Sequence, residues 1–600
     1  MNDLPFHRPA LHEAYAAGLT PEAVISEAYR RIDALADPGI FLHRVPIEQA
    51  VAEAAGLGPF DPARLPLFGL PFAIKDNIEL EGAPTTAACL AFAYRAERDA
   101  QVVAKLRRVG AIPIGKTNLD QFATGLVGVR TPYPVPRNAL DPAIVPGGSS
   151  SGSAVAVAHG LVGFALGTDT AGSGRVPAAL NNIVGLKPSL GLVSSSGVVP
   201  AYRTLDTVSI FALTAADAHA VLAVAAGFDP ADPFARPYGP SLWSAPPPEF
   251  RLGVPDAPSR EFFGDSEQSA AFAAALDDLR DMGASIDELD FSPFFEVAAM
   301  LYAGGWVAER LTVIEDLLAR QPDAVHPVTR QIVTAAERLS AADAFRGIYR
   351  LAELERRAEP LLDRVDLLAV PSIPTFYSVA DLEADPIGPN ARLGTYTNFV
   401  NLMDLAGIAV PTRPRGDGRP GSVTLLAEAG SDGRLAALAE ALHQRSGTTL
   451  GATGWPLPEP QPGSPAAGPH EITLAVVGAH MAGLPLNPEL TRRGARFLET
   501  TRTAPCYRLF ALAGGPPERP GLVRTASGGA SIALELWAMS EAALGGFIAT
   551  VPQPLSIGTL TLEDGRLVKG FLAEATASDD ALDITACGGW RAHLATRPAA

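Results

Sequence analysis

Two glycine- and serine-rich stretches and one lysine offer the groups needed for nucleophilic catalysis. The stretches are 146–153 (PGGSSSGS) and 167–175 (GTDTAGSGR), and Lys75 ends the apolar run 69–75 (GLPFAIK). A serine hydroxyl is a weak nucleophile at neutral pH and needs a base beside it. Lysine can be that base only when it is neutral, a state that burial favours. The glycines let backbone N–H groups approach a developing oxyanion. These residues therefore indicate an acyl-transfer site without histidine.

Simpler interpretations exist for each of these features. A Gly/Ser run is usually a flexible turn or linker, but apolar chain follows this one at 154–158 and 161–166. A single lysine is usually a solvated charge. This chain, however, has only five lysines among its 47 basic residues, and Lys75 follows three apolar residues. A lysine retained there indicates a role that the very high pKa of arginine would exclude.

The elements that must position these residues alternate between helix and strand. Residues 10–55 show helical spacing, with a start signal at 20–22 (TPE). Buried strands are predicted over 67–74 and 111–114, with a helix over 100–109 between them. Since 161–166 continues the alternation, we predict an α/β fold: a mixed sheet flanked by helices.

The later part of the chain suggests an insertion, the end of the core and a second domain. A helical region over 266–360 resembles an insertion or lid. The segment 407–411 is predicted to be the last core strand, followed by a closing helix over 435–443. A proline-rich stretch at 455–465 cannot pack as regular helix or sheet. We therefore expect a first domain over 1–454, a linker over 455–469 and a small β-rich C-terminal domain over 470–600, whose short apolar runs are 474–478, 507–512, 532–537 and 567–572.

Length and charge limit the classes of function. Six hundred residues exceed one ordinary core, which again favours two domains. The 65 acidic against 47 basic side chains give a formal charge of −18, which argues against partners such as nucleic acid or an anionic membrane. Three scattered cysteines fit neither a disulfide framework nor a zinc site, and we expect no cofactor. This cysteine usage suits a reducing compartment, so we expect a cytoplasmic protein. The N-terminus has no signal pattern, and the apolar run 153–167 is too short to span a bilayer.

Together the three segments resemble the amidase-signature family of serine hydrolases. Related pieces are 115–120 (GKTNLD), 185–189 (GLKPS) and 366–371 (DLLAVP), so the likeness runs from about residue 20 to 445. The resemblance implies Ser173 as nucleophile, Ser149 as a cis-serine that relays the proton and Lys75 as base. It also implies an oxyanion hole from the backbone amides of the nucleophile segment, at Thr170, Ala171, Gly172 and Ser173 itself.

Three departures from the general family pattern resemble its allophanate hydrolase branch. Ala171 replaces a glycine that most members have, and Gly174 replaces a bulkier residue. Tyr302 and Arg310 match the pair that holds the substrate in that branch. The segments 475–480 (AVVGAH) and 551–555 (VPQPL) resemble the C-terminal domain of such proteins, whose fold is similar to γ-glutamylcyclotransferase-like domains.

The branch resemblance implies a substrate and a division of labour. Allophanate, a small planar ureido carboxylate, would be held by Tyr302, Arg310 and Gly125. An arginine fork matches a carboxylate in geometry and charge. The first product would be N-carboxycarbamate, which the C-terminal domain would decarboxylate with His480 as proton-transfer residue. The resemblance also implies a homodimer.

Alternatives remain open at this stage. Arg310 could pair within its helix with Glu309 or Asp316, or lie on a solvated face; Tyr302 could be a core residue, and His480 could cap a turn. A broad-specificity amidase, with the C-terminal domain only as a dimerisation or docking module, is the main functional alternative. A glutaminase component of a tRNA amidotransferase shares the core, but its expected tail is unlike this one.

Overall fold

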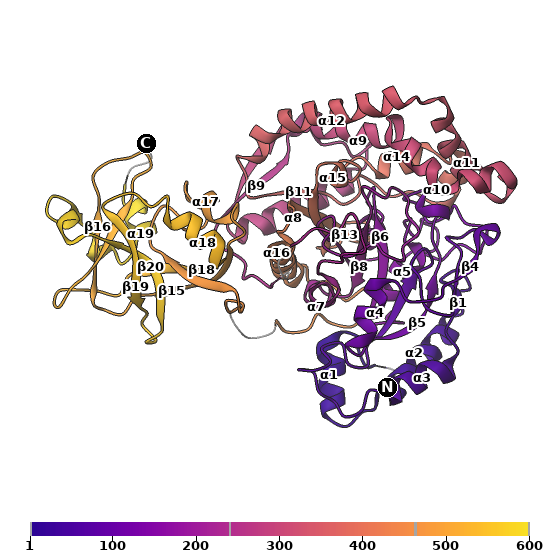
Figure 1. Ribbon diagram of the computed structural model, residues 1–600, viewed down its shortest axis with the longest axis horizontal. Coiled ribbons are helices and arrows are strands. Elements are labelled where there is room, and N and C mark those ends of the chain that lie inside the picture. Colours follow the sequence, from indigo (N-terminus) through magenta and orange to yellow (C-terminus); the bar gives the residue numbers. More distant parts are fainter. Residues whose placement is uncertain (1–2, 239–241, 461–464, 598–600) are drawn as a thin grey trace. The chain divides into compact units, whose positions relative to one another are not determined.

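The computed structural model describes residues 3–238, 242–460 and 465–597, and it divides the chain into two compact units (Figure 1). The first unit comprises Met1–Ser241, Leu252–Asp281 and Ile286–Pro460, and the second comprises Leu242–Arg251, Met282–Ser285 and Gln461–Ala600. Two short segments from the middle of the chain are thus grouped with the C-terminal unit. The predicted domain bounds 1–454, 455–469 and 470–600 stay predictions.

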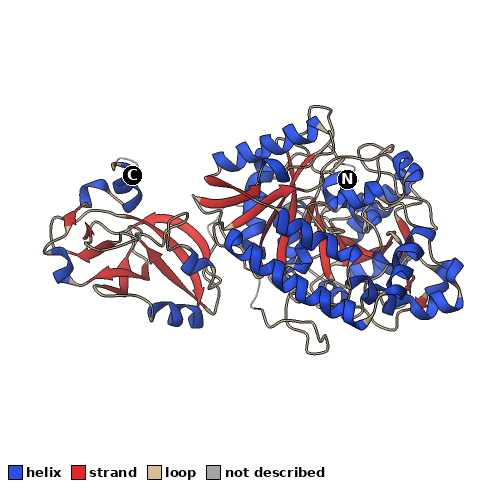
Figure 2. Ribbon diagram, turned by 90° about the horizontal axis from the view of Figure 1, so that it is seen from above, coloured by secondary structure: helices blue, strands red, loops and turns tan. Residues whose placement is uncertain are grey.

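A large mixed sheet forms the centre of the first unit (Figure 2). In the described part of the chain it has eleven strands in the order β1-β5-β2-β6-β8-β7-β12-β13-β11-β9-β10. The β5-β2-β6 neighbours are parallel, whereas β6-β8-β7-β12-β13 are antiparallel. The strands are β1 (Phe41–Arg44), β2 (Pro71–Lys75), β5 (Ile112–Thr117), β6 (Phe164–Asp169), β7 (Val184–Lys187), β8 (Thr207–Ala212), β9 (Phe250–Pro255), β10 (Ala284–Leu289), β11 (Leu367–Pro371), β12 (Leu405–Thr412) and β13 (Gly421–Glu428); a small hairpin joins β3 (Pro84–Thr85) to β4 (Tyr94–Arg95).

Helices surround this sheet, as the alternating pattern predicts. The α/β class with a mixed sheet and flanking helices is confirmed. The helices are α1 (Arg8–Ala16), α2 (Pro21–Leu35), α3 (Ile47–Ala55), α4 (Gln101–Arg108), α5 (Ser151–Ala158), α6 (Val176–Leu180), α7 (Ala215–Ala225), α8 (Ser266–Asp281), α9 (Ser292–Ala303), α10 (Trp306–Arg320), α11 (Pro327–Thr334), α12 (Ala341–Leu362), α13 (Val379–Ala384), α14 (Gly388–Leu393), α15 (Phe399–Leu402) and α16 (Asp432–Arg445).

Burial explains why the strands nearest the candidate site carry few polar residues. Every residue of β2 and of β6 is buried, as expected for central strands that are covered on both faces. Helix α5 (SGSAVAVA) is likewise buried on all sides, because it has no polar face to turn towards water. The Gly/Ser run before α5 therefore lies inside the fold and is not a solvated linker.

Three sequence predictions need correction. The region 10–55 is not wholly helical, since β1 lies between α2 and α3. The region 266–360 is not wholly helical, since β10 interrupts it. Strand β10 (ASIDEL) alternates polar and apolar residues and lies at the edge of the sheet, where polar residues discourage pairing with a further strand. The segment 407–411 lies in β12 but is not the last core strand, because β13 follows and pairs with it along its full length. Turn residues flank β13 at 416–421 (GDGRPG) and 430–433 (GSDG), so the sequence did carry a signal for this strand, which the prediction overlooked.

One helical stretch, Ser292–Arg320, is long and apolar enough to cross a membrane by length and composition alone. Residues 304 and 305 divide it into α9 and α10. Phe294, Val297 and Leu301 of α9 belong to the hydrophobic core. A helix that packs in a protein core can be as long and as apolar as a membrane span, so length and composition alone do not indicate one here.

The second unit is built mainly from strands. Its main sheet has the order β15-β18-β14-β20-β19, and a smaller sheet has the order β17-β16-β21. The strands are β14 (Glu471–Val476), β15 (Arg496–Arg502), β16 (Tyr507–Ala511), β17 (Pro520–Arg524), β18 (Ala533–Ser540), β19 (Leu555–Thr561), β20 (Leu567–Ala573) and β21 (Leu582–Asp583), with helices α17 (Pro488–Thr491), α18 (Glu541–Ile548) and α19 (Trp590–Ala595). The prediction of a separate β-rich C-terminal domain is therefore confirmed.

Candidate active site

Lys75 lies at the end of β2, where its side chain is completely buried. Its Nζ donates to Ser149 Oγ and to Thr168 Oγ1, both at 2.7 Å. Burial lowers the pKa of this amine to about 7, although the charges of Asp206, Asp120 and Asp169 act in the opposite direction. A neutral lysine is therefore accessible near neutral pH, and it contacts a serine hydroxyl.

Ser149 lies two residues before α5 and follows a cis peptide bond from Gly148. Its carbonyl accepts from the amide of Asp120 at 3.0 Å. A Cβ at position 148 would lie 2.0 Å from Asp120 Oδ2, so only glycine fits there. Gly148 therefore lets this segment pack closely against Asp120, in the position where Ser149 contacts Lys75.

Ser173 lies in the loop between β6 and α6, and its Oγ donates to Gly125 O at 3.5 Å. Asp169, the last residue of β6, shapes this loop by accepting from the amides of Gly172 at 3.1 Å and Gly174 at 2.9 Å. In the described part of the chain the hydroxyls of Ser173 and Ser149 make no hydrogen bond with each other. Lys75 and Ser149 are thus in direct contact, whereas the Ser173 hydroxyl is held by Gly125.

The backbone amides predicted for the oxyanion hole are not equivalent. The Gly172 amide already donates to Asp169, and the Ala171 carbonyl accepts from Thr397 Oγ1 at 2.6 Å. Gly172 has a φ of +119°, a conformation that favours glycine, and a Cβ there would meet Thr397 Oγ1 at 2.5 Å. In this geometry the Gly172 amide is occupied, which leaves the amides of Thr170, Ala171 and Ser173 as the candidate donors.

A buried ion pair holds the base of the nucleophile loop. Arg175 contacts both carboxylate oxygens of Asp169, at 3.0 and 2.9 Å, and neither side chain is exposed. Burial alone would raise the pKa of Asp169, but Arg175, together with Lys187 and the Gly174 amide, brings this pKa below its usual range. The aspartate therefore stays charged and accepts hydrogen bonds from the loop amides of Gly172 and Gly174.

Replacing Arg175 by alanine should destabilise the first unit strongly. Removing one partner leaves an uncompensated buried carboxylate, at a cost of about 3–5 kcal/mol. Urea unfolding of the intact chain measures the change. Arg44→Ala is the matched control, because the Arg44–Asp33 pair is exposed, and it should cost less than about 1 kcal/mol. Similar losses in the two variants would contradict a special role for the buried pair.

Arg310 lies on α10 and is only 2% exposed, so it does not lie on a solvated face. Its Nη1 donates to Thr124 Oγ1, and its guanidinium lies over the ring of Tyr202, 4.3 Å from the centroid. Glu309 bonds instead to the amide and hydroxyl of Thr204. Among the described residues, no carboxylate forms a salt bridge with Arg310, and its Nε and Nη2 lack hydrogen-bond partners. A buried cation with open donors indicates an anionic ligand.

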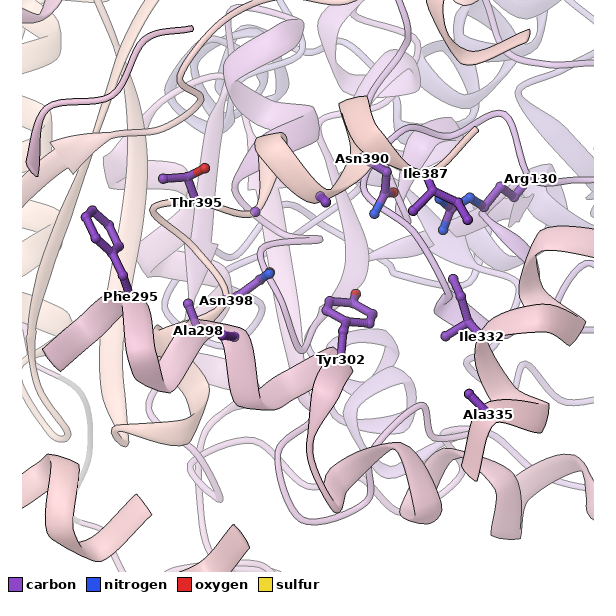
Figure 3. Close-up of a pocket in the computed structure, with 13 residues that line it drawn as sticks. Arg130, Phe295, Ala298, Tyr302, Ile332, Ala335, Ile387, Asn390, Thr395 and Asn398 are labelled. Carbon is purple, nitrogen blue, oxygen red and sulfur yellow. The ribbon is translucent and has the colours of Figure 1, made fainter. Parts of the chain in front are cut away.

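Tyr302 borders a cavity of about 470 Å³ in the first unit (Figure 3). Phe295, Ala298 and Tyr302 extend from α9 towards the facing segment that carries Asn390 and Thr395. Arg130 and Ile332 close one end of the cavity. Tyr302 also packs against the core and lies 6.0 Å from the Arg310 guanidinium, measured to its ring centroid. It is thus both a core residue and a wall of the cavity.

The loop 120–130 connects this cavity to the serines. Gly125 O accepts from Ser173, while Thr124 accepts from Arg310 through its hydroxyl and from Arg130 through its carbonyl, at 2.9 Å. Sequence reasoning missed Arg130, because no motif marks it and an isolated arginine carries little information. It also missed Thr168, the second partner of Lys75, although Thr168 lies in the quoted segment 167–175.

His480 lies in the second unit, outside the Lys75 region. Its Nε2 is 3.3 Å from Glu489 Oε2, and its ring stacks on Phe571 and contacts the edge of Phe547. Burial lowers the pKa of this histidine, and Glu489 partly opposes the shift. The imidazole is therefore held by a carboxylate and two aromatic rings, an arrangement different from that of a turn-capping side chain.

Within the residues that the structure describes, no group of three or more histidine, cysteine, aspartate and glutamate side chains is arranged to hold a metal ion.

Comparison with known proteins assigns the class to which this fold and site belong. Residues 23–436 match the Amidase family, and residues 472–595 match the Allophanate hydrolase C-terminal domain. The chain therefore belongs to the amidase family of hydrolases and carries this additional domain.

Three relatives illustrate the similarity. Urea amidolyase from Saccharomyces cerevisiae is 43% identical over 547 residues, which cover 88% of this chain but 30% of the relative. The chain thus spans about a third of the length of the urea amidolyases that it matches. The structure of Kluyveromyces lactis allophanate hydrolase superimposes with a TM-score of 0.78, at 37% identity and 98% coverage of both chains. The structure of native peptide amidase from Stenotrophomonas maltophilia superimposes with a TM-score of 0.60, at 26% identity, covering 72% of this chain and 95% of the relative.

Proposed function

We propose that this chain hydrolyses allophanate with a Ser173–Ser149–Lys75 triad. The observation that carries the proposal is the buried Lys75, hydrogen-bonded to Ser149 and with a pKa of about 7, in the same unit as a buried arginine that lacks an anionic partner among the described residues. The likeness to allophanate hydrolase over nearly the whole length of both chains supports the choice of substrate.

In the proposed reaction, Ser173 Oγ attacks the ureido carbonyl carbon. Its proton passes to Ser149, whose own proton passes to neutral Lys75. For this transfer the Ser173 hydroxyl must turn away from Gly125 O, to which it donates in the structure. The tetrahedral oxyanion accepts hydrogen bonds from the amides of Thr170, Ala171 and Ser173, each such donor contributing about 10²–10³ in rate in related chemistry. The C–N bond then breaks, and Lys75 returns a proton through Ser149 to the leaving ammonia. Water resolves the acyl-enzyme by the same route.

The substrate carboxylate would bind to Arg310 through its open Nε and Nη2 donors. Tyr302 lies beside it. Gly125 packs closely against Asp120, since a Cβ there would lie 2.5 Å from Asp120 Oδ2, and its carbonyl accepts from Ser173 Oγ, which places it at the proposed site. This arrangement favours a small anionic ureide over a larger neutral amide.

The decisive assay is the ammonia released from allophanate, urea, biuret and a simple amide by the purified chain. Turnover of allophanate alone supports the proposal. Turnover of the neutral amide at an equal or higher kcat/KM would favour the alternative of a broad-specificity amidase, in which the second unit is a dimerisation or docking module. A homodimer, a cytoplasmic location and the likeness of the second unit to γ-glutamylcyclotransferase-like domains stay predictions; sedimentation velocity tests the first.

We further propose that the second unit decarboxylates the product N-carboxycarbamate and that His480 transfers the proton. His480→Ala should leave the first release of ammonia unchanged but delay the release of carbon dioxide, because the imidazole held by Glu489 is lost. Carbon NMR on labelled allophanate follows both steps at early times, before unaided decay hides the difference. His593→Ala, a second histidine of the same unit, is the control. If carbon dioxide appears without a lag in His480→Ala, the histidine has no part in decarboxylation.

A further inference from the structure

Asp206 connects the nucleophile loop to the residues beneath Arg310. It directly precedes β8, and its carboxylate accepts from the hydroxyl of Thr170, where the nucleophile loop begins. The same carboxylate accepts from the amides of Ala201, at 2.6 Å, and Tyr202, at 3.1 and 3.2 Å. One side chain thus joins two segments that both border the candidate site.

The second of these segments supports the candidate anion site. The buried Tyr202 ring lies under the Arg310 guanidinium, and its hydroxyl donates to the carbonyl of Leu301 at 2.9 Å, next to Tyr302. We call Tyr202, Tyr302 and Arg310 the cation platform. Through Tyr202, Asp206 fixes the position of this platform relative to Thr170 and therefore relative to Ser173.

We propose that Asp206 is a positioning residue, which holds the nucleophile loop against the cation platform and places a negative charge near Lys75 and Arg310. The inference rests on the proposed function for the roles of Ser173, Ser149 and Lys75. It adds a residue that takes no part in the triad and that no sequence motif discussed above includes.

The charges around Lys75 make the electrostatic part testable. Asp206, Asp120 and Asp169 act to raise the pKa of Lys75 and Arg310 acts to lower it, with burial as the largest influence. Removing the charge of Asp206 should therefore lower the pKa of Lys75 further, so that the amine becomes neutral at a lower pH. Burial raises the pKa of Asp206 to about 6, so its carboxylate is mostly charged at pH 7, close to the pKa of Lys75.

Two substitutions separate the charge from the hydrogen bonds. In Asp206→Asn the amide oxygen can accept from the two backbone amides while its NH₂ donates to Thr170 Oγ1, so the connection survives and the charge is lost. Thr170→Val removes the connection and keeps the charge. Thr170→Ser restores a hydroxyl and is the conservative rescue. Asp232→Asn is the matched control, because Asp206 and Asp232 both line one cavity of about 330 Å³. Asp232 accepts hydrogen bonds from Ser195 and from the amide of Phe234, and not from the nucleophile loop.

The experiment measures, across the pH range, the rate at which phenylmethanesulfonyl fluoride inactivates the intact chain. This probe reports Ser173 activation and needs no allophanate. The midpoint of the rise in rate should move to lower pH by at least about half a unit in Asp206→Asn and should not move in Asp232→Asn. In allophanate turnover Thr170→Val should lose about 10- to 100-fold in kcat with little change in KM, because a hydrogen bond to a charged group is lost, and Thr170→Ser should recover most of it.

Each outcome bears on a specific part of the inference. An unmoved midpoint in Asp206→Asn, or an equal shift in Asp232→Asn, overturns the electrostatic role. A wild-type kcat in Thr170→Val overturns the positioning role. This variant removes only one hydrogen bond, so it still tests that role if Asp206→Asn fails to fold. If the unaltered chain reacts with the probe but not with allophanate, the proposed function fails while the Asp206 inference is still tested by the probe.

Discussion

Replacing Lys75 by arginine should reduce ammonia release from allophanate by about 10⁴-fold or more while the chain stays folded. Arginine keeps the positive charge but cannot become neutral near pH 7, so it cannot accept the proton that reaches Ser149. Ser173→Ala should show a loss of the same order, because the nucleophile and its base act as one unit. The measurement is initial-rate ammonia release, with circular dichroism to verify folding.

A control and a pH profile sharpen this prediction. Lys116→Arg substitutes another buried lysine, one that forms an ion pair with Asp76 at 3.2 Å, and it should keep most of the activity. In the unaltered chain, kcat/KM should rise with pH around an apparent pKa near 7, because activity requires the neutral form of Lys75. Substantial turnover in Lys75→Arg, or activity that rises as pH falls below 7, would exclude lysine as the base.

The sequence predicted the α/β fold and the β-rich second domain because their signals are local. Buried strands such as β2 and β6 are short apolar runs between turn residues, and the helix start at Thr20 is a side-chain cap, as the structure shows. The glycine- and serine-rich runs are noticeable because such runs are unusual inside apolar chain, and the resemblance to the amidase-signature family then gave the three triad candidates. The sequence could not give the geometry of these residues. For example, it could not show that the Gly172 amide already donates to Asp169.

The missed features depend on contacts between distant segments. Asp206 is 36 residues from Thr170, and Arg130 is 256 residues from Pro386, to whose carbonyl it donates. Neither residue type marks a function by itself, because isolated charges are mostly solvated. Strand β10 was missed for another reason: an edge strand needs only one buried face, so its polar residues resemble those of a helix surface.

Replacing Arg310 by alanine should reduce kcat/KM for allophanate by about 10²- to 10³-fold and should change the turnover of a neutral amide such as malonamide little. Loss of the cation leaves the substrate carboxylate buried without a partner, which costs about 2–5 kcal/mol when a charged hydrogen-bonded pair is truncated. Arg310→Lys should recover only part of the loss, because a lysine cannot form the planar fork. Tyr302→Phe should act in the same direction with a smaller effect.

The comparison of the two substrates distinguishes recognition from support of the fold. Arg310 also donates to Thr124 and lies on Tyr202, so its removal could disturb the loop that carries Gly125. Such a disturbance would misplace Ser173 and lower turnover of charged and neutral substrates alike. Arg320→Ala, at the exposed end of the same helix, is the matched control and should affect neither. Equal losses on both substrates in Arg310→Ala would assign this residue to the scaffold. A selective loss would make its two open donors the determinant of substrate charge, since the fold and the nucleophile would then be intact.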